Sequence, residues 1–330
     1  MLNPDYHSMG DIEYYRKSEY SSSIRDTALS VQKGNQLRGR KALVTGASGL
    51  VGSYLSDVLM ELESIVYVAG RNTEKLQTRF PGAHPLTYDL SSEIMFNESF
   101  DYIIHCAGYG HPRAFVDDPE GILLNSVLGT KRLLGYAEEH NVKRFLYISS
   151  GEVYGDIDSM TSRACYPLGK QAGENLCAIY KDKHQLDTVV ARLCHTFGPG
   201  ISDNDNRATA QFFRAALANK DIILKSKGEQ LRSYLYVADS VSAILTVLLS
   251  GESGKAYDIA SDECVITIAN LARTIAEVAG VEVRFEIPNE DEKRQQSPIS
   301  KQVLNGDSLR ELKWAYRYSI DEGCRETMIL

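Results

Sequence analysis

The chain has 330 residues, which is long enough for one large α/β domain with a smaller lobe attached. Its composition, 43% hydrophobic and 24% charged residues, is ordinary for a soluble globular protein. The net charge of −8 and the lack of a lysine/arginine cluster argue against nucleic acid as a partner. Apolar runs such as Val247–Leu249 are too short to span a bilayer, and the N-terminus lacks the apolar core of a signal peptide. We therefore expect a cytoplasmic protein without a membrane partner.

The six cysteines are scattered, with no C-x-x-C pair and no spacing typical of metal ligands. They are expected to be free thiols in a reducing compartment, and no metal site is predicted. Residues 1–38 are interpreted as an N-terminal extension, in which the charged, tyrosine-containing stretch 11–24 is compatible with a short helix.

From residue 39 to residue 200, short β-rich runs alternate with segments of helical periodicity, the pattern of a parallel sheet with helices on both faces. The clearest helices are Pro119–His140 and Pro167–Lys183. The predicted strands are Ala42–Thr45, Ile65–Ala69, Leu86–Tyr88, Tyr102–Cys106, Arg144–Ser149 and Thr188–Leu193. This predicts a Rossmann-type, doubly wound parallel sheet, with ligands at the carboxyl ends of its strands.

Beyond residue 200 the pattern changes, and residues 201–330 are interpreted mainly as a smaller mixed α/β lobe for the substrate. The sequence is also compatible with some of its segments joining the Rossmann sheet. The charged stretch 289–300 is interpreted as a mobile loop over one face. The predicted elements are helices at Ala208–Ala218, Val237–Leu249 and Ile268–Val278 and strands at Asp221–Leu224 and near Val281–Ile287.

A glycine turn follows the first predicted strand, with the spacing G-x-x-G-x-x-G before an amphipathic segment. Glycine permits a tight turn and close approach of a ligand to the backbone. The free N–H groups at the start of the next helix attract a phosphate. A tight turn that binds no ligand is the alternative. We predict a pyrophosphate cradle made by Gly46, Ser48, Gly49, Leu50, Val51 and Gly52.

Arg71 follows the second predicted strand, where folds selective for NAD usually carry an acidic residue for the ribose 2′-hydroxyl. Its planar guanidinium can pair with a 2′-phosphate, which favours NADP over NAD as the cofactor. An arginine in a solvated turn is the alternative. Arg71 and Asn72 are therefore candidate cofactor contacts.

Asp89 and Leu90 follow the third predicted strand, where the carboxylate can accept a hydrogen bond from the adenine amino group. An aspartate that only forms a turn fits the sequence equally well. The fourth strand ends in H-C-A-G, and its small residues Ala107 and Gly108 let a ribose and its phosphates lie close to the backbone.

Tyr166 and Lys170 open a helix four residues apart, so their side chains share one face. A tyrosine normally titrates near pH 10, too high for a base at neutral pH. A lysine ammonium one turn away, together with a cationic nicotinamide, is expected to lower that pKa. Ser150 ends the fifth strand, where its hydroxyl can stabilise a developing oxyanion on the substrate. Together with the glycine turn, this order of residues predicts an oxidoreductase site.

These motifs resemble those of the extended short-chain dehydrogenases/reductases of the NAD-dependent epimerase/dehydratase family, which act on nucleotide-sugars. The resemblance runs from about residue 39 to the C-terminus. It rests on T-G-A-S-G-L-V-G, H-C-A-G, S-S-G-E-V-Y-G, Y-P-L-G-K, R-L-C-H-T-F-G-P-G and G-E-Q-L-R. It implies that Tyr166 is the catalytic base and acid and that Ser150 is the hydroxyl donor. Lys170 would anchor the nicotinamide ribose, and Arg232 would bind the diphosphate or the sugar.

Glu152 matches the glutamate that dehydratases and uronate decarboxylases of this family carry two residues after the serine. Its carboxylate can move a proton at a carbon next to a transient 4-keto group, or can make only a structural hydrogen bond. Gly151 stands where the dehydratases use aspartate, which argues against a dTDP-glucose-type dehydratase. His195 replaces the asparagine usual before the G-P segment. The predicted substrate contacts are Ser150, Gly151, Glu152, His195 and Arg232.

The resemblance thus implies an enzyme that oxidises a nucleotide-sugar at carbon four with NAD or NADP. Elimination, decarboxylation or epimerisation would follow, and the hydride would then return. A one-way NADPH-dependent reductase of a keto nucleotide-sugar is an alternative, as is a non-catalytic NAD(P)-binding sensor. The family also implies a homodimer that pairs through the two long helices.

Overall fold

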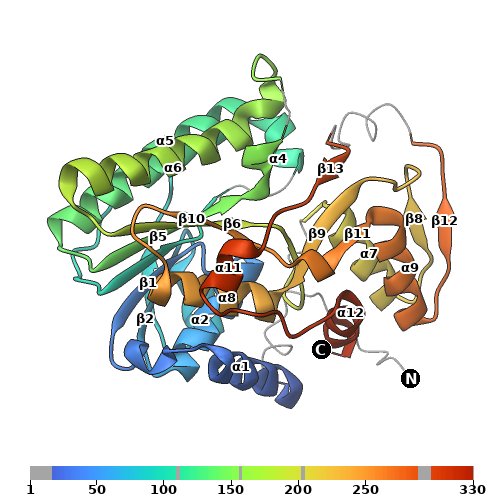
Figure 1. Cartoon of the computed structure of the whole chain (residues 1–330), viewed down its shortest axis with the longest axis horizontal. Coiled ribbons are helices and arrows are strands. Elements are labelled where there is room, and N and C mark those ends of the chain that lie inside the picture. The colour runs from blue at the N-terminus through green and yellow to red at the C-terminus, as the bar shows by residue number, and fades with distance from the viewer. Residues whose placement is uncertain (1–16, 109–111, 156–157, 202–204, 289–298, 330) are drawn as a thin grey trace.

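Seven parallel strands form the central sheet, in the spatial order β10-β6-β5-β4-β1-β2-β3 (Figure 1). The computed structural model describes residues 17–108, 112–155, 158–201, 205–288 and 299–329. The strands run outward in both directions from β1 and β4, so the winding reverses between them. This confirms the predicted doubly wound sheet. Its strands are β1 (Lys41–Thr45), β2 (Ile65–Gly70), β3 (His84–Thr87), β4 (Tyr102–His105), β5 (Arg144–Ser150), β6 (Thr188–Leu193) and β10 (Ala256–Ile259).

The first six of these strands overlap the six predicted ones, with ends that differ by at most two residues. The third is shifted most, since β3 begins at His84 and ends at Thr87. The seventh strand, β10, was not predicted. It comes from the C-terminal part of the chain and pairs in parallel with β6, Tyr257 lying opposite Ala191. Its sequence Ala-Tyr-Asp-Ile is too short to show a period.

Helices cover both faces of the sheet. Helices α5 (Pro119–Glu139) and α6 (Cys165–His184) lie side by side on one face, and α1 (Ser18–Ser30), α2 (Leu50–Glu61) and α8 (Val237–Ser250) lie on the other (Figure 1). The shorter α3 (Thr73–Arg79) packs on β2 and β3. The described helices include none with the length and apolarity needed to cross a membrane.

Helix boundaries follow local chemistry. Helix α5 begins with Pro119 in its first turn, and Asp118 caps it by accepting a hydrogen bond from Gly121 N at 2.9 Å. Helix α8 is buried nearly all round, from Val237 to Leu248, which explains its continuous apolar sequence. The helix expected at 11–24 starts instead at Ser18 and extends to Ser30, while residues 11–16 lie outside the described part of the chain.

A second group of elements lies beside the carboxyl ends of the sheet strands (Figure 1). Its centre is β9 (Leu231–Tyr236), which pairs with β11 (Val265–Thr267), β13 (Lys301–Gln302) and β7 (His195–Phe197). The group also contains α7 (Ala208–Leu217), β8 (Ile222–Leu224), α9 (Ile268–Ala279), β12 (Val283–Phe285) and α12 (Ile320–Ile329), whereas α11 (Asp307–Glu311) packs on β10 of the central sheet. The predicted segments at 208–218, 221–224, 268–278 and 281–287 match α7, β8, α9 and β12. Most of the stretch 289–300 lies outside the described residues.

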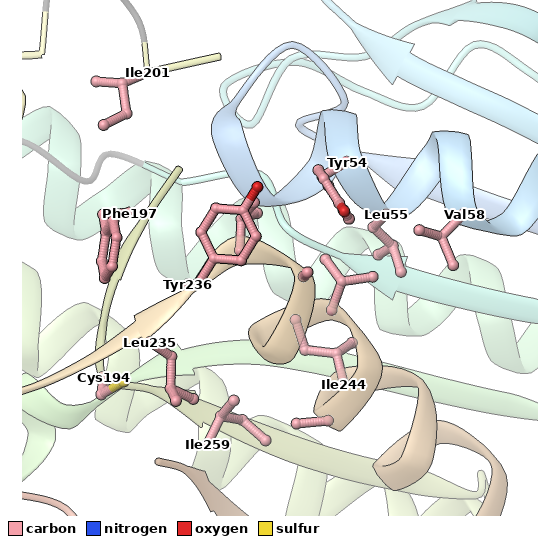
Figure 2. Close-up of a cluster of buried hydrophobic side chains, with 14 of the residues drawn as sticks. Tyr54, Leu55, Val58, Cys194, Phe197, Ile201, Leu235, Tyr236, Ile244 and Ile259 are labelled. Atoms are coloured by element: carbon pink, nitrogen blue, oxygen red, sulfur yellow. The ribbon is translucent and has the colours of Figure 1, made fainter. Parts of the chain in front are cut away.

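One hydrophobic core joins the sheet to this second group. Figure 2 shows Tyr54 and Leu55 of α2, Ile244 of α8 and Ile259 of β10 within one buried cluster that continues to Leu235 and Tyr236 of β9. Burial of apolar area contributes roughly 25 cal/mol per Å². The shared core therefore fixes β9, and the residues it carries, against the ends of β5 and β6.

Candidate active site

A cavity of about 210 Å³ lies at the carboxyl ends of the central strands. The glycine turn after β1 and the first turn of α2 form one wall. Cys106 and Gly108, which follow β4, lie beside them, and Ser149 and Ser150 at the end of β5 face them. The cavity therefore occupies the point where the winding of the sheet reverses, the place where such folds bind ligands.

The glycine turn has the geometry of a nucleotide cradle. Gly46 has a φ of +67°, and a Cβ built on it would lie 2.7 Å from Ala107 N. A Cβ on Gly52 would lie 2.4 Å from the carbonyl oxygen of Gly46. Thr45 Oγ1 accepts a hydrogen bond from Ala107 N at 3.1 Å, which fixes the two strand ends together. Side chains at these glycines are thus excluded, and the N-terminus of α2 opens directly onto the cavity, as a dinucleotide pyrophosphate requires.

The other predicted cofactor residues lie beyond the walls of this cavity. Ser48 and Arg71 are exposed. Asn72 caps α3 by accepting from Lys75 N at 2.9 Å. Asp89 Oδ1 accepts from Ser91 N and Ser91 Oγ at 2.8 and 2.7 Å, which makes it a turn-forming aspartate. Leu90 is buried against Gly129 of α5. Contacts of these residues with the cofactor stay a prediction.

Tyr166 and Lys170 come together as their spacing predicts, Ser150 at the end of β5 lies with them, and all three line the cavity. The Ser150 hydroxyl hydrogen-bonds the Tyr166 phenol. Lys170 Nζ lies 5.9 Å from the centre of the Tyr166 ring and donates to the carbonyl oxygen of Ile148 at 2.7 Å. The lysine is held by the end of β5 rather than by the phenol.

The pKa of Tyr166 differs from the predicted direction. Burial raises it to about 12, and the charge of Glu152 acts in the same direction. The hydrogen bond from Ser150 and the cations Arg207 and Arg163 lower it, but by less. Burial also lowers the pKa of Lys170 to about 8. The sequence-based expectation ignored desolvation, which disfavours both charged forms.

Glu152 follows Ser150 in a 3₁₀ turn, η3 (Gly151–Tyr154), at the end of β5. Its Oε2 accepts a hydrogen bond from Nη2 of Arg163 at 3.0 Å. Glu152 lines both this cavity and a larger one beside it. The carboxylate is therefore an ion-paired group at the junction of two cavities.

Three predicted substrate residues have partners within the chain. His195 Nε2 lies 3.0 Å from Gln302 Oε1, and burial lowers the pKa of His195 to about 4, so the ring is neutral at physiological pH. Arg232 donates to the carbonyl oxygens of Leu231 and Ile299 at 2.9 and 2.5 Å. Gly151 is buried, and its Cα faces the Leu304 side chain.

The larger cavity, of about 440 Å³, shares Glu152, His195, Arg207 and Gln302 with the first. Sequence reasoning missed Arg207, which lines both cavities and is held by Asp205 through its Nε at 2.9 Å. The sequence could have indicated Arg207 as a site residue, because it lies in the polar loop after G-P-G and loops at strand ends often carry function. The sequence could not have indicated Gln302 as a partner of His195, since the two residues are more than a hundred positions apart.

Comparison with known proteins gives a consistent result. A family model described as the NAD dependent epimerase/dehydratase family matches residues 42–260. UDP-glucuronic acid decarboxylase 2 of Arabidopsis thaliana is 28% identical over 348 residues, covering 98% of this chain and 75% of that protein.

Two solved structures have the same fold. WbmF from Bordetella bronchiseptica, in complex with NAD+ and UDP, has a TM-score of 0.74 and 25% identity over 89% of this chain and 92% of its own. Epimerase Mth375 from Methanothermobacter thermautotrophicus has a TM-score of 0.78 and 23% identity, covering 93% of this chain and 95% of its own.

Proposed function

The chain belongs to the NAD-dependent epimerase/dehydratase family and is therefore an enzyme, and from this premise we propose that it decarboxylates a nucleotide-linked uronic acid through oxidation at carbon four. One observation carries the proposal. Ser150, Glu152 and Tyr166 line the cavity beside the glycine cradle, and Glu152 also lines the larger, cation-rich cavity next to it. The sensor alternative is set aside, because the family is one of enzymes.

The lining of the larger cavity favours an anionic substrate. Arg163, Arg207, Lys225 and Arg232 line it, and Glu152 is the acidic residue among its described lining residues. Such an excess of cations suits both a diphosphate and a sugar carboxylate. Several of the similar curated proteins are UDP-glucuronic acid decarboxylases, which supports a uronate over a neutral sugar.

In the proposed reaction, Tyr166 removes the proton of the carbon-four hydroxyl while Ser150 hydrogen-bonds the same oxygen. NAD(P), held by the glycine turn after β1, would supply a hydride acceptor for carbon four and the hydride that later returns to it. The 4-keto uronate is a β-keto acid, so the bond to the carboxylate breaks and its electron pair forms an enolate with the ketone. Glu152 then assists the transfer of a proton to carbon five, and Tyr166 returns a proton to the oxygen at carbon four.

The choice between NAD and NADP is proposed to depend on Arg71. Its exposed guanidinium lies after β2, near enough to Asp89 to lower the pKa of that carboxyl together with the Ser91 hydrogen bonds. We expect Arg71→Ala to weaken NADP+ binding more than NAD+ binding, measured by calorimetry. Tighter binding of NAD+ than of NADP+ by the unmodified protein would show the NADP preference to be wrong.

Incubation with UDP-glucuronic acid, UDP-glucose, dTDP-glucose and UDP-galactose tests the reaction. We expect loss of carbon dioxide from UDP-glucuronic acid, seen by mass spectrometry, with no net change of reduced nicotinamide. Tyr166→Phe, the control, should be inactive. Isomerisation or loss of water without decarboxylation would favour an epimerase or a dehydratase. Consumption of one NADPH per turnover would favour the keto-sugar reductase, which Arg71 would suit.

A further inference from the structure

Arg163 lies at the centre of a small group of side chains around the catalytic tyrosine. It belongs to the 3₁₀ turn η4 (Ser162–Ala164), directly before α6. Its Nη2 pairs with Glu152 Oε2 at 3.0 Å, and both side chains are largely buried, with exposed fractions of 24% and 17%. Its Nη1 is also buried and has no hydrogen-bond partner among the described residues. Glu152 is therefore the ion-pair partner that compensates this guanidinium within the described chain.

The guanidinium also stacks on an aromatic ring. The Arg163 Cζ lies 4.7 Å from the centre of the Phe115 ring, which belongs to α4 (Pro112–Asp117). The Phe115 ring in turn stacks on the Tyr166 ring, with centroids 4.9 Å apart and planes 22° apart. A guanidinium over an aromatic face contributes about 0.5–2 kcal/mol. Arg163 thus contacts Glu152 directly and Tyr166 through one ring.

Several charged or titratable groups surround the Tyr166 phenol. Glu152 lies on η3, Arg163 on η4, Arg207 before α7, Lys170 on the helix of Tyr166 itself and Tyr147 on β5. Glu152 disfavours the phenolate, whereas Arg163 and Arg207 favour it. Arg207 is bound by Asp205, so Arg163 is the cation paired with the acid that opposes the phenolate.

We propose that Arg163 is a positioning residue that makes the Glu152 carboxylate compatible with a phenolate at Tyr166. The ion pair places a positive charge beside Glu152, so that both groups can be ionised in one low-dielectric site. The Phe115 ring, stacked on the Tyr166 ring, holds the phenol ring in place beside the cavity. The inference rests on the proposed function only in that Tyr166 and Glu152 take part in the reaction.

The fraction of phenolate at Tyr166 tests the proposal without any substrate. The full-length protein, saturated with NAD+, is labelled with [13Cζ]tyrosine, and the resonance that disappears in Tyr166→Phe is assigned to Tyr166. Its population-weighted chemical shift is followed from about pH 7 to the highest pH at which the protein stays folded, because a pKa raised to about 12 leaves little phenolate at neutral pH. We expect Arg163→Gln to reduce that fraction and Glu152→Gln to increase it.

The double variant gives the sharper comparison. In Arg163→Gln/Glu152→Gln both charges are gone, so the phenolate fraction should return towards that of the unmodified protein. Arg163→Lys retains the charge and should keep most of the phenolate that Arg163→Gln loses. The control Arg132→Gln removes an arginine of α5 that has a similar exposed fraction, 26%, and pairs with Glu93, and it should leave the Tyr166 resonance unchanged.

An unchanged Tyr166 shift in a folded Arg163→Gln protein would overturn the proposal. So would a double variant with as little phenolate as Arg163→Gln alone, since Glu152 would then not be the charge that Arg163 offsets. Phe115→Leu distinguishes the contribution of ring stacking from that of the Arg163 charge. It should lower the rate of hydride transfer from UDP-glucuronic acid without changing the phenolate fraction. Absence of carbon dioxide release would count against the proposed function alone, because the resonance reports on Tyr166 regardless of turnover.

Discussion

At the scale of single residues, the site combines two groups whose burial opposes the reaction. The buried Tyr166 has a pKa raised to about 12 and the buried Lys170 a pKa lowered to about 8, each because burial disfavours the charged form. The chain offsets this with Arg163 and Arg207, two cations near the phenol that lower its pKa. The phenolate is therefore the minor form in the protein alone, and in the proposed reaction its fraction would limit the first step.

This leads to a prediction on pH dependence. Since the phenolate fraction grows as the pH rises towards a raised pKa, the single-turnover rate of NADH formation from UDP-glucuronic acid should increase about tenfold per pH unit below that pKa. Stopped-flow absorbance measures it. Tyr166→Phe should lower the rate by about 10²-fold or more and abolish the slope. A rate independent of pH in the unmodified protein would mean that Tyr166 is not the base.

Gly151 gives a second prediction at this scale. A Cβ built there would lie 2.5 Å from Leu304 Cδ1, and Leu304 is buried. We expect Gly151→Ala to lower the free energy of unfolding by about 1–3 kcal/mol, the usual cost of overpacking a core. Denaturant unfolding measures the change. In a Leu304→Ala background the same substitution should cost less, and equal costs in both backgrounds would show that the two residues do not compete for space.

At the scale of elements, the N-terminal helix α1 is tied to α2 by one buried ion pair network. Asp57 of α2 accepts a hydrogen bond from Tyr20 OH of α1 at 2.6 Å and from Arg79 Nη1 of α3 at 3.2 Å. A second pair, Arg25 with Glu61 at 3.7 Å, joins the same two helices at the surface. The described part of the extension, residues 17–38, is thus part of the sheet's helical layer rather than a separate arm.

Loss of the buried ion pair should lower the free energy of unfolding more than loss of the surface ion pair. Asp57→Ala removes the carboxylate of a largely buried ion pair, whose side chains are exposed to 14% and 11%, and we expect it to lower the free energy of unfolding by about 3–5 kcal/mol. Arg25→Ala, whose pair has exposed fractions of 66% and 41%, should cost about 1 kcal/mol or less. Both variants are compared by urea unfolding. Equal costs would contradict the assignment of α1 docking to the buried network.

The elements also show what could be predicted from sequence. Strands β1, β2, β4, β5 and β6 were predicted because each is an apolar run before a turn or a helix. Strands β7, β9 and β13 were not, although β8 and β12, of three residues each, were; β9 carries the buried polar Arg232 and Ser233. Local spacing predicted that Tyr166 and Lys170 share a helix face. The partners Arg163, Gln302 and Arg207 come together only through the tertiary fold.

At the scale of the whole molecule, one surface stands out. Helices α5 and α6 lie side by side on the outer face of the sheet (Figure 1). Their outward side chains include Leu124, Leu128 and Ile179, with exposed fractions of 49%, 43% and 42%. Apolar residues gathered on a helix pair are typical of a surface that pairs with a second copy of itself. The dimer expected from the family stays a prediction, and this is the surface it would use.

We therefore expect light scattering to show a dimer. Combining Leu128→Glu with Ile179→Glu should give a monomer, because the two-fold symmetry of the interface would bury both copies of each new charge. Leu29→Glu is the matched control: Leu29 is exposed to 78% on α1, on the opposite face of the sheet, and the change should leave the dimer intact. The active-site residues Ser150 and Tyr166 lie at the ends of β5 and at the start of α6. Loss of the dimer should therefore also weaken NAD(P) binding, since α6 carries Lys170. A monomeric unmodified protein would show that this surface forms no dimer. A dimer that survives both substitutions would show that the subunits contact each other elsewhere.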